Sequence, residues 1–563
     1  MRFNDLRGAA HQGSILRAQA PAPVEQEYET LSPFEFKDKL IALATSHQQK
    51  SAYVMLNAGR GNPNWTAATP REGFFALGQF AVEECRRTWN EGDLAGKPIK
   101  AGSAERLEHY LRLHSQTPGV QWLQKFIRYG TDTLHFDADD WVHQLTDGII
   151  GDNYPVPDRM LGYCEEVIRK FLYKELYSKE LYSKDPSSKA NPLQLFGTEG
   201  ATAAMCYLFD SLLANFLLHP GDKVAVMVPV FPPYVEIPQL SRFNFDVVEI
   251  RATAMNQEGW HTWQYPQKEL EKLRDPSIKA LFTVNPSNPP SVAMDEGSLE
   301  YIADIVHIHH PNLMVISDDV YATFADNYVS LAGVLPYNTL AVYSFSKYFG
   351  VTGWRLGVMA LAQENVYDRL LSKLPQDEQS ALAGRYASIT RRPEQLNFIQ
   401  RLVADSRQVA LNHTAGLSTP QQVQMAMLAG FALLDENDEY KHLTRHVCRK
   451  RKQQLYQGLH LPEPNVPHSA DYYTEFDLEE WATRHYGAAF TQYLKEHYEP
   501  VDIVLRLAQQ SSIVLLNGGG FRAPRWSIRV SLANLPDDAY TQIGAKLHQV
   551  LEDYVAAWRG SLG

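Results

Sequence analysis

The chain has few cysteines and no long apolar run. Cys85, Cys164, Cys206 and Cys448 are the four cysteines among 563 residues, and none of them form a CxxC pair. Because this is too sparse for a disulfide framework or a cysteine zinc site, we expect reduced thiols, as in a cytoplasmic protein. Every apolar run is far shorter than the roughly 18 residues of a spanning helix. The sequence therefore predicts no membrane partner and no resident metal.

Positive charge is also scarce. Lysine and arginine number 53 against 65 acidic residues, a formal net charge of −12. Nucleic acids select clustered basic residues, so we expect no nucleic-acid partner. A small anionic substrate stays compatible, because a few buried arginines can dominate a local field. The 24 Phe, 29 Tyr and 10 Trp exclude disorder over most of the chain.

Short β-branched runs alternate with helix-like stretches from about residue 193 onward. We expect helices at 201–218 and 297–310, and strands at 224–228, 247–250, 280–284, 314–316, 340–343 and 356–361. Such alternation is typical of a mostly parallel sheet covered by helices on both faces. Nearer the start, Ser32 and Pro33 predict a helix N-terminus, and 72–128 is expected to be mostly helical.

The chemistry-bearing residues follow the predicted strands. In a sheet of this kind, ligands bind at the carboxyl ends of the strands. The residues found there are Phe231, Asn288, Asp318, Asp319, Lys347 and, eight positions later, Arg355. The turn at 196–201 also leads into a helix N-terminus, where free backbone N–H groups bind anions. Together they predict a pocket for a phosphorylated, aromatic, nitrogen-containing cofactor that reacts with a lysine amine.

The segment 344–357, SFSKYFGVTGWRLG, resembles the Schiff-base lysine motif of the fold-type I pyridoxal-phosphate enzymes, specifically the aspartate aminotransferase superfamily. The resemblance covers roughly residues 50 to 540. It implies an α/β architecture with a mostly parallel sheet sandwiched by helices and a smaller α/β domain. It also implies pyridoxal 5′-phosphate as cofactor and an amino acid as substrate, with Lys347 forming the Schiff base.

The same resemblance assigns roles to other residues. It implies phosphate contacts from Arg355, Ser344, Ser346, the backbone of Thr198 and Glu199, and Tyr154 of a neighbouring subunit. It pairs Asp318 with the ring nitrogen, places Tyr321 and Asn288 at the ring oxygen, and stacks Phe231 on the ring. Arg529 and Gly59 would meet the substrate α-carboxylate.

These roles have physical reasons. Lys347 must be partly unprotonated to react, and burial beside cations lowers an amine pKa. Asp318 must be ionised so that the ring nitrogen stays protonated and the ring withdraws electrons. Arg529 offers a carboxylate a planar fork that lysine lacks.

The length narrows the resemblance. Extra residues before Tyr154 and a helix-compatible insertion at about 363–416 resemble the aspartate 4-decarboxylase family, which converts L-aspartate to L-alanine and CO2 with some aspartate aminotransferase activity. Aminotransferases place a distal-carboxylate arginine before a turn like 417–420, but His413 and Thr414 stand there here. Lys50, Arg60 and Arg71 are then candidates for that carboxylate, the alternative for each being ordinary surface charge.

Other functions and the domain plan complete the expectations. The alternatives are an aminotransferase acting on aspartate or another amino acid with a 2-oxo acid acceptor, a C–S lyase or cyclopropane-forming enzyme, and a non-catalytic α/β module. We expect an N-terminal arm at 1–32, a small domain from 33–120 and 436–563, and a large domain at 121–435. A homodimer is the expected minimum, with a higher homo-oligomer beyond it.

Overall fold

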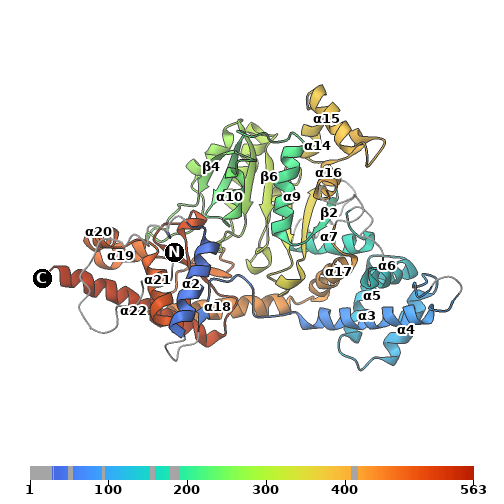
Figure 1. Ribbon diagram of the computed structural model, residues 1–563, viewed down its shortest axis with the longest axis horizontal. Helices are drawn as coiled ribbons and strands as arrows, with labels where there is room; N and C mark the ends of the chain where they lie inside the picture. Colours follow the sequence, from blue (N-terminus) through green and yellow to red (C-terminus); the bar gives the residue numbers. More distant parts are fainter. Residues whose placement is uncertain are drawn as a thin grey trace, which may run out of the picture.

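The computed structural model describes residue 28 and residues 31–48, 55–91, 95–152, 159–177, 191–407 and 416–562. Figure 1 shows a central sheet with a helical lobe on either side. Within the described ranges, no helix combines the length and the apolar character needed to cross a membrane.

The central sheet has seven strands in the order β2-β8-β7-β6-β5-β3-β4. They are β2 (Leu193–Thr198), β3 (Lys223–Val228), β4 (Asp246–Arg251), β5 (Ile278–Val284), β6 (Met314–Asp318), β7 (Thr339–Ser344) and β8 (Gly357–Ala362). Strands β4, β3, β5, β6 and β7 are parallel, and β8 is antiparallel to both of its neighbours. The predicted strands and the mostly parallel sheet are confirmed.

Both faces of this sheet are buried. Along β3, Val224 and Val226 enter the core that contains α9 (Ala201–Ala214), while Ala225 enters the core that contains α12 (Glu296–His309). Successive side chains of a strand point to opposite faces, so one apolar run supplies both cores. The helices that were expected at 201–218 and 297–310 therefore lie on opposite sides of the sheet.

Other helices complete the body around the sheet. They are α7 (Gly162–Leu176), α10 (Pro233–Gln239), α11 (Gln267–Leu270), η2 (Glu271–Arg274), η3 (Ala322–Phe324), α13 (Leu331–Val334), η4 (Thr352–Trp354) and α17 (Thr419–Leu434). Helix α17 contacts α7, and it also contacts the helical lobe that precedes the sheet in sequence.

A second, smaller α/β unit has its own core. It contains α2 (Pro33–Gln48), β1 (Leu56–Asn57), α18 (Glu439–Leu459), β9 (Tyr473–Asp477), α19 (Leu478–Tyr486), α20 (Ala488–His497), α21 (Asp502–Ser511), β10 (Ile513–Val514), β11 (Leu516–Asn517), η6 (Gly519–Phe521), β12 (Ser527–Ser531) and α22 (Asp537–Ser561). Helix α2 begins as predicted, because the Ser32 hydroxyl accepts a hydrogen bond from the Glu35 amide (3.4 Å). Strands β11, β12 and β9 form an antiparallel sheet, and β1 pairs with β10.

The helical segment 68–152 departs from the domain plan over residues 68–120, which the plan assigns to the small domain. Its helices are α3 (Ala68–Arg87), α4 (Ser103–Leu113), α5 (Val120–Arg128), the π-helix η1 (Tyr129–Thr133) and α6 (Ala138–Ile150). Leu77 and Phe80 of α3 are buried in the same core as the central sheet, and α3 contacts α5, α6 and α17. The N-terminal share of the small core therefore ends near residue 58 rather than at 120.

The insertion after β8 is helical where the structure describes it, over 363–407. It contains α14 (Val366–Leu371), α15 (Gln376–Tyr386), η5 (Pro393–Gln395) and α16 (Phe398–Ser406). Asp405 fastens it to the body: its carboxylate accepts hydrogen bonds from Ser211 (2.6 Å) and Asn215 (2.9 Å) at α9, and from Arg385 (2.9 Å).

Candidate active site

A cavity of about 270 Å³ lies where the carboxyl ends of the parallel strands meet the small unit. Its lining includes Phe34, Gly61, Phe231, Asn288, Asp318, Tyr321, Ser344, Ser346, Lys347, Arg355, Tyr473 and Arg529. Nine of these are predicted site residues, drawn from segments as far apart as 231 and 529. The structure therefore brings most of the predicted set into one cavity.

Lys347 follows β7, and its amine reaches the cavity. Its Nζ donates to the Gly61 carbonyl oxygen (2.9 Å). Burial lowers the pKa of this amine, and the nearby Arg529 and Arg355 charges lower it further, against the opposing influence of Tyr473 and Asp318. A lowered pKa increases the unprotonated fraction of the amine, which is the reactive form.

The backbone around Lys347 is held from two sides. The Trp65 indole N–H donates to the carbonyls of Lys347 (3.2 Å) and Tyr348 (3.0 Å). From α3, Arg71 donates to the carbonyls of Phe349 (3.3 Å) and Gly350 (2.7 Å). Arg71 thus braces the lysine loop, and its guanidinium does not line the cavity.

Asp318 ends β6 and is buried. Its Oδ2 accepts from the Tyr234 hydroxyl (3.0 Å) and its Oδ1 from the Val320 amide (3.2 Å). Burial raises its pKa to about 6, while these two hydrogen bonds and Lys347 act in the opposite direction. A cationic ring nitrogen beside this carboxyl would favour its ionised form, so the residue fits the partner that the resemblance assigns to it.

The start of α9 forms an anion cradle. Gly200 is the N-cap with φ of +92°, and no side chain caps the free N–H groups of the first turn. A Cβ at Gly200 would lie 2.7 Å from the Arg355 Nη2, so glycine lets the guanidinium approach the helix start. Ser344 and Ser346 line the same cavity as Arg355. A positive helix end, a guanidinium and hydroxyls fit a phosphate.

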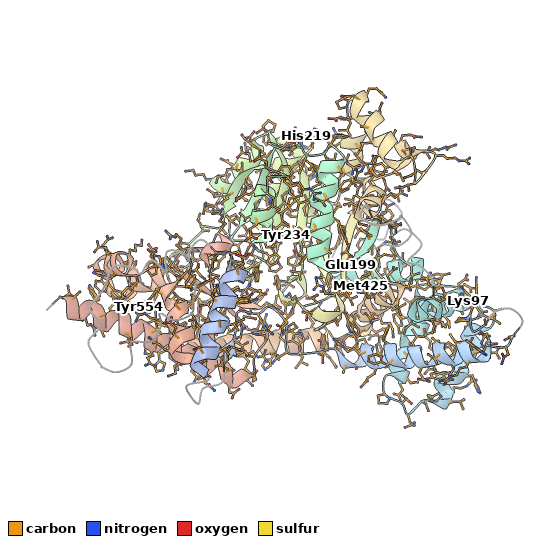
Figure 2. All side chains as sticks on the ribbon, in the orientation of Figure 1. Lys97, Glu199, His219, Tyr234, Met425 and Tyr554 are labelled. Atoms are coloured by element: carbon orange, nitrogen blue, oxygen red, sulfur yellow. The ribbon has the colours of Figure 1, made fainter. Side chains whose placement is uncertain are left out.

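Thr198 and Glu199 precede this cradle, and their side chains are engaged elsewhere. The Thr198 hydroxyl donates to the Gly200 carbonyl (3.3 Å), and the Glu199 carboxylate accepts from Tyr207 (3.1 Å). Figure 2 shows Glu199 at the lower end of α9. Any contact of these two residues with a phosphate would therefore come from the backbone, as the resemblance implies.

Arg529 is a buried cation, only 2% exposed. Its Nη1 donates to the Asn288 side-chain oxygen (3.0 Å) and its Nη2 to the Gly59 carbonyl (2.8 Å). The guanidinium lies between the rings of Tyr473 (4.3 Å) and Phe521 (4.9 Å). Within the described ranges, no carboxylate pairs with it, which leaves a planar cation suited to a substrate carboxylate.

Among the lining residues that were not predicted, two contribute aromatic side chains. Tyr473 of β9 places its hydroxyl 2.9 Å from that of Tyr321, and Phe34 of α2 packs edge-on against Phe231, with ring centroids 5.8 Å apart. Both come from the small unit and approach the sheet only in the folded chain. No local motif marked either one, although the Ser32–Pro33 helix start already placed Phe34 in a first helical turn.

Some predicted residues are not in the cavity. Arg60 is exposed and, like Arg71, is absent from the cavity lining. The structure therefore places neither arginine in the cavity where a substrate would bind. Gly59 acts through its carbonyl on Arg529. Tyr154, Lys50, His413 and Thr414 lie outside the described residues.

A lysine with a lowered pKa, a buried acid at the end of the neighbouring strand and an anion cradle together fit a pyridoxal-phosphate-dependent enzyme. A family model, aminotransferase class I and II, matches residues 180–547. The bifunctional aspartate aminotransferase and L-aspartate beta-decarboxylase of Pseudomonas sp. is 46% identical over 525 residues, 93% of this chain and 96% of the relative. The chain therefore belongs to the class I and II aminotransferase family.

Solved structures agree on the fold. An aspartate aminotransferase double mutant from Thermus thermophilus has a TM-score of 0.53 at 17% identity, covering 92% of this chain and 96% of that one. An aromatic aminotransferase from Pyrococcus horikoshii has a TM-score of 0.54 at 18% identity, covering 91% and 99%. The predicted family, fold and cofactor are confirmed.

Proposed function

We propose that this enzyme converts L-aspartate to L-alanine and CO2, with aspartate aminotransferase activity alongside. The observation that carries the proposal is the set of cations around the cavity. In the described part of the chain these are Lys347, Arg355 and Arg529. If Arg355 meets the phosphate and Arg529 the α-carboxylate, no further arginine of that set is left to clamp a distal carboxylate.

A loosely held distal carboxylate favours decarboxylation. Leaving as CO2 removes the charge of that carboxylate, so a strong ion pair would stabilise the ground state more than the transition state. The bifunctional Pseudomonas relative supports the same proposal, because its similarity extends over nearly the whole chain, including the segments before and after the lysine motif.

The residues of the cavity have separate tasks. Pyridoxal phosphate, when bound, supplies an aldehyde for the substrate amine and a ring that takes up electrons released at Cα. Arg529 fixes the α-carboxylate, which orients the Cα–H bond toward Lys347. The Lys347 amine removes and returns protons at that position. Loss of CO2 from the substrate consumes one proton, which is added at Cβ. The Phe34 and Phe231 rings restrict the access of water at the cavity wall.

Release of CO2 in the absence of a 2-oxo acid tests the proposal. The holoenzyme is given L-aspartate labelled in its distal carboxylate, with no acceptor. We expect labelled CO2 and an equal amount of alanine, and neither from Lys347→Ala. Strict dependence on a 2-oxo acid, with no gas, would overturn decarboxylation and leave the second candidate, an aminotransferase. Membership of the aminotransferase family favours that candidate over a C–S lyase.

The proposal extends to assembly and location. We infer a cytoplasmic homodimer at minimum, in which Tyr154 reaches the phosphate of the neighbouring subunit, and a higher homo-oligomer built from it. Light scattering of the holoenzyme checks this, and a monomeric mass would contradict it.

A further inference from the structure

A second acid faces Arg529 from the neighbouring strand. Glu475 on β9 is the direct partner of Arg529 on β12 in their antiparallel register. Directly opposite residues project to the same face of a sheet, with Cβ atoms about 5 Å apart. Glu475 is only 9% exposed, so this acid and this cation share a buried environment.

The two side chains do not pair in the structure. The Oε2 of Glu475 and the Nε of Arg529 are both buried without a hydrogen-bond partner. An ionised carboxylate buried this close to a guanidinium would gain strongly by pairing with it, and an unpaired buried charge is costly. The arrangement is therefore more consistent with a neutral carboxyl at Glu475.

The hydroxyl of Ser527 supports the same conclusion, because it has one proton for two contacts. Its Oγ contacts both the Pro524 carbonyl oxygen (2.7 Å) and the Oε1 of Glu475. A serine hydroxyl has one proton, and a carbonyl oxygen can only accept. If Ser527 donates to Pro524, then Glu475 must supply the proton of the other contact. Gly518 leaves room for this pair, since a Cβ there would collide with both Ser527 and Glu475.

We propose that Glu475 is a positioning residue that controls how much of the Arg529 charge is available to substrate. Protonated Glu475 leaves the guanidinium free to bind the α-carboxylate. Ionised Glu475 pairs with Arg529 and competes with the substrate. The inference rests on the carboxylate-binding role of Arg529, which the proposed decarboxylase and the alternative aminotransferase share.

The surrounding charges leave Arg529 as the partner for an ionised Glu475. Lys452 of α18 pairs with Asp471 (2.9 Å), and His261 lies 3.2 Å from Asp477 of β9 and 3.7 Å from Glu480 of α19. The remaining titratable neighbours are Tyr456 of α18 and Tyr473 of β9. Arg529, which stands opposite Glu475 on β12, pairs with no carboxylate in the described part of the chain.

The titration of Glu475 falls in an accessible range. Burial, with a smaller contribution from Asp477, raises the pKa of the Glu475 carboxyl to about 8, against the opposing influence of Arg529 and of the hydrogen bond that Ser527 donates to the ionised carboxylate. Substrate carboxylate binding should therefore be strong at neutral pH and weaken at alkaline pH. The direction follows because deprotonation creates the competing charge.

Binding of succinate, a non-reacting dicarboxylate, to the holoenzyme tests this inference. For the native enzyme we expect the affinity to fall by up to ~10-fold per pH unit above the Glu475 pKa. Glu475→Gln, a neutral mimic of the protonated acid, should bind succinate as tightly as the native enzyme does near neutral pH. Its succinate affinity should not fall at alkaline pH. Glu480→Gln, a neighbouring acid that does not oppose Arg529, is the matched control and should keep the decline.

If the succinate affinity of Glu475→Gln declined at alkaline pH as steeply as that of the native enzyme, the inference would be overturned. Should that variant fail to fold, infrared difference spectra of native enzyme carrying carboxyl-labelled glutamate replace it. We expect an absorption band of protonated glutamic acid that disappears as the pH rises, over the same interval in which the succinate affinity falls. The absence of such a band would contradict the inference. Neither readout needs decarboxylation, so the result stands apart from the proposed function.

Discussion

Asp318 and Lys347 face the same cavity with pKa values shifted toward their neutral forms, mainly by burial. The two shifts serve different ends. A neutral lysine amine can react and accept a proton, whereas a carboxyl at Asp318 is useful only when a cation restores its charge. The site is thus prepared for a cationic ring nitrogen and a reactive aldehyde rather than for two permanent charges.

Asp318→Asn should keep the shape of the site and remove the charge. We expect turnover to fall at least ~100-fold, because the amide cannot keep the ring nitrogen protonated, and preorganised charge at a reacting group typically contributes that much. Steady-state turnover, with cofactor content measured by absorbance, checks the prediction. A variant that retains full cofactor and near-native turnover would show that the ring nitrogen needs no anion here.

Tyr473→Phe separates the two contacts of that side chain. The ring against Arg529 stays, so KM for aspartate should change little, while Tyr321 loses its hydroxyl partner and kcat should fall roughly 2- to 10-fold. Tyr473→Leu, which also removes the ring, should raise KM as well. If the Phe variant raised KM and left kcat unchanged, the hydroxyl would be assigned to substrate binding instead.

Which site residues could be predicted depended on how local their signal is. Lys347 and Arg355 stand in one contiguous motif, and Asp318 directly follows a buried strand, so sequence alone indicated them. Tyr473 and Phe34 carry no such signal because they reach the cavity from a different folding unit. Arg71 was assigned by its charge, but a sequence does not show that a guanidinium will bind carbonyls some 280 residues away.

At the scale of elements, the strands were predictable because short runs of β-branched apolar residues are typical of strands that are buried on both faces of a sheet. The stretch 72–128 was expected to be mostly helical, yet the packing partner of its part before residue 121 was misjudged. An amphipathic pattern shows that a helix buries one face, but it does not say against what. Here α3 buries its face against α5, α6 and α17, which places the lobe with the large body.

The helical insertion offers a prediction at this scale. Asp405→Ala would leave Ser211, Asn215, Arg385 and Tyr386 without their shared acceptor. We expect a loss of about 3 kcal/mol in the free energy of unfolding, measured by denaturant titration. Glu394→Ala, an exposed acid of the same insertion, is the control and should change it by less than ~0.5 kcal/mol. Equal effects would show that the network does not anchor the insertion.

At the scale of the molecule, the catalytic groups come from both units. Lys347 and Asp318 belong to the large body, whereas Arg529 and Tyr473 belong to the small one, so the cavity exists only when the two are packed together. Buried contacts hold this arrangement, including Lys441 of α18 with Glu175 of α7 (2.7 Å). A substrate that binds Arg529 and Lys347 together would stabilise the packed state.

The buried acids predict how stability depends on pH. Burial raises the pKa of Asp318 to about 6, of Asp319 to about 7 and of Glu475 to about 8, all above their ordinary values. The folded chain therefore holds protons that the unfolded chain has released, so their stabilising contribution is complete below about pH 4 and is lost as pH rises toward 8. The melting temperature of cofactor-free enzyme should fall from pH 6 to pH 8. A rise over that interval would show that these acids are ionised in the fold.

The most direct test of the whole account is chemical trapping at Lys347. Borohydride reduction of the holoenzyme, followed by peptide mass mapping, should place one pyridoxyl group on that side chain and none elsewhere. An enzyme that carries the adduct on another lysine, or that binds the cofactor without any reducible link, would contradict the assignment of this cavity as the active site.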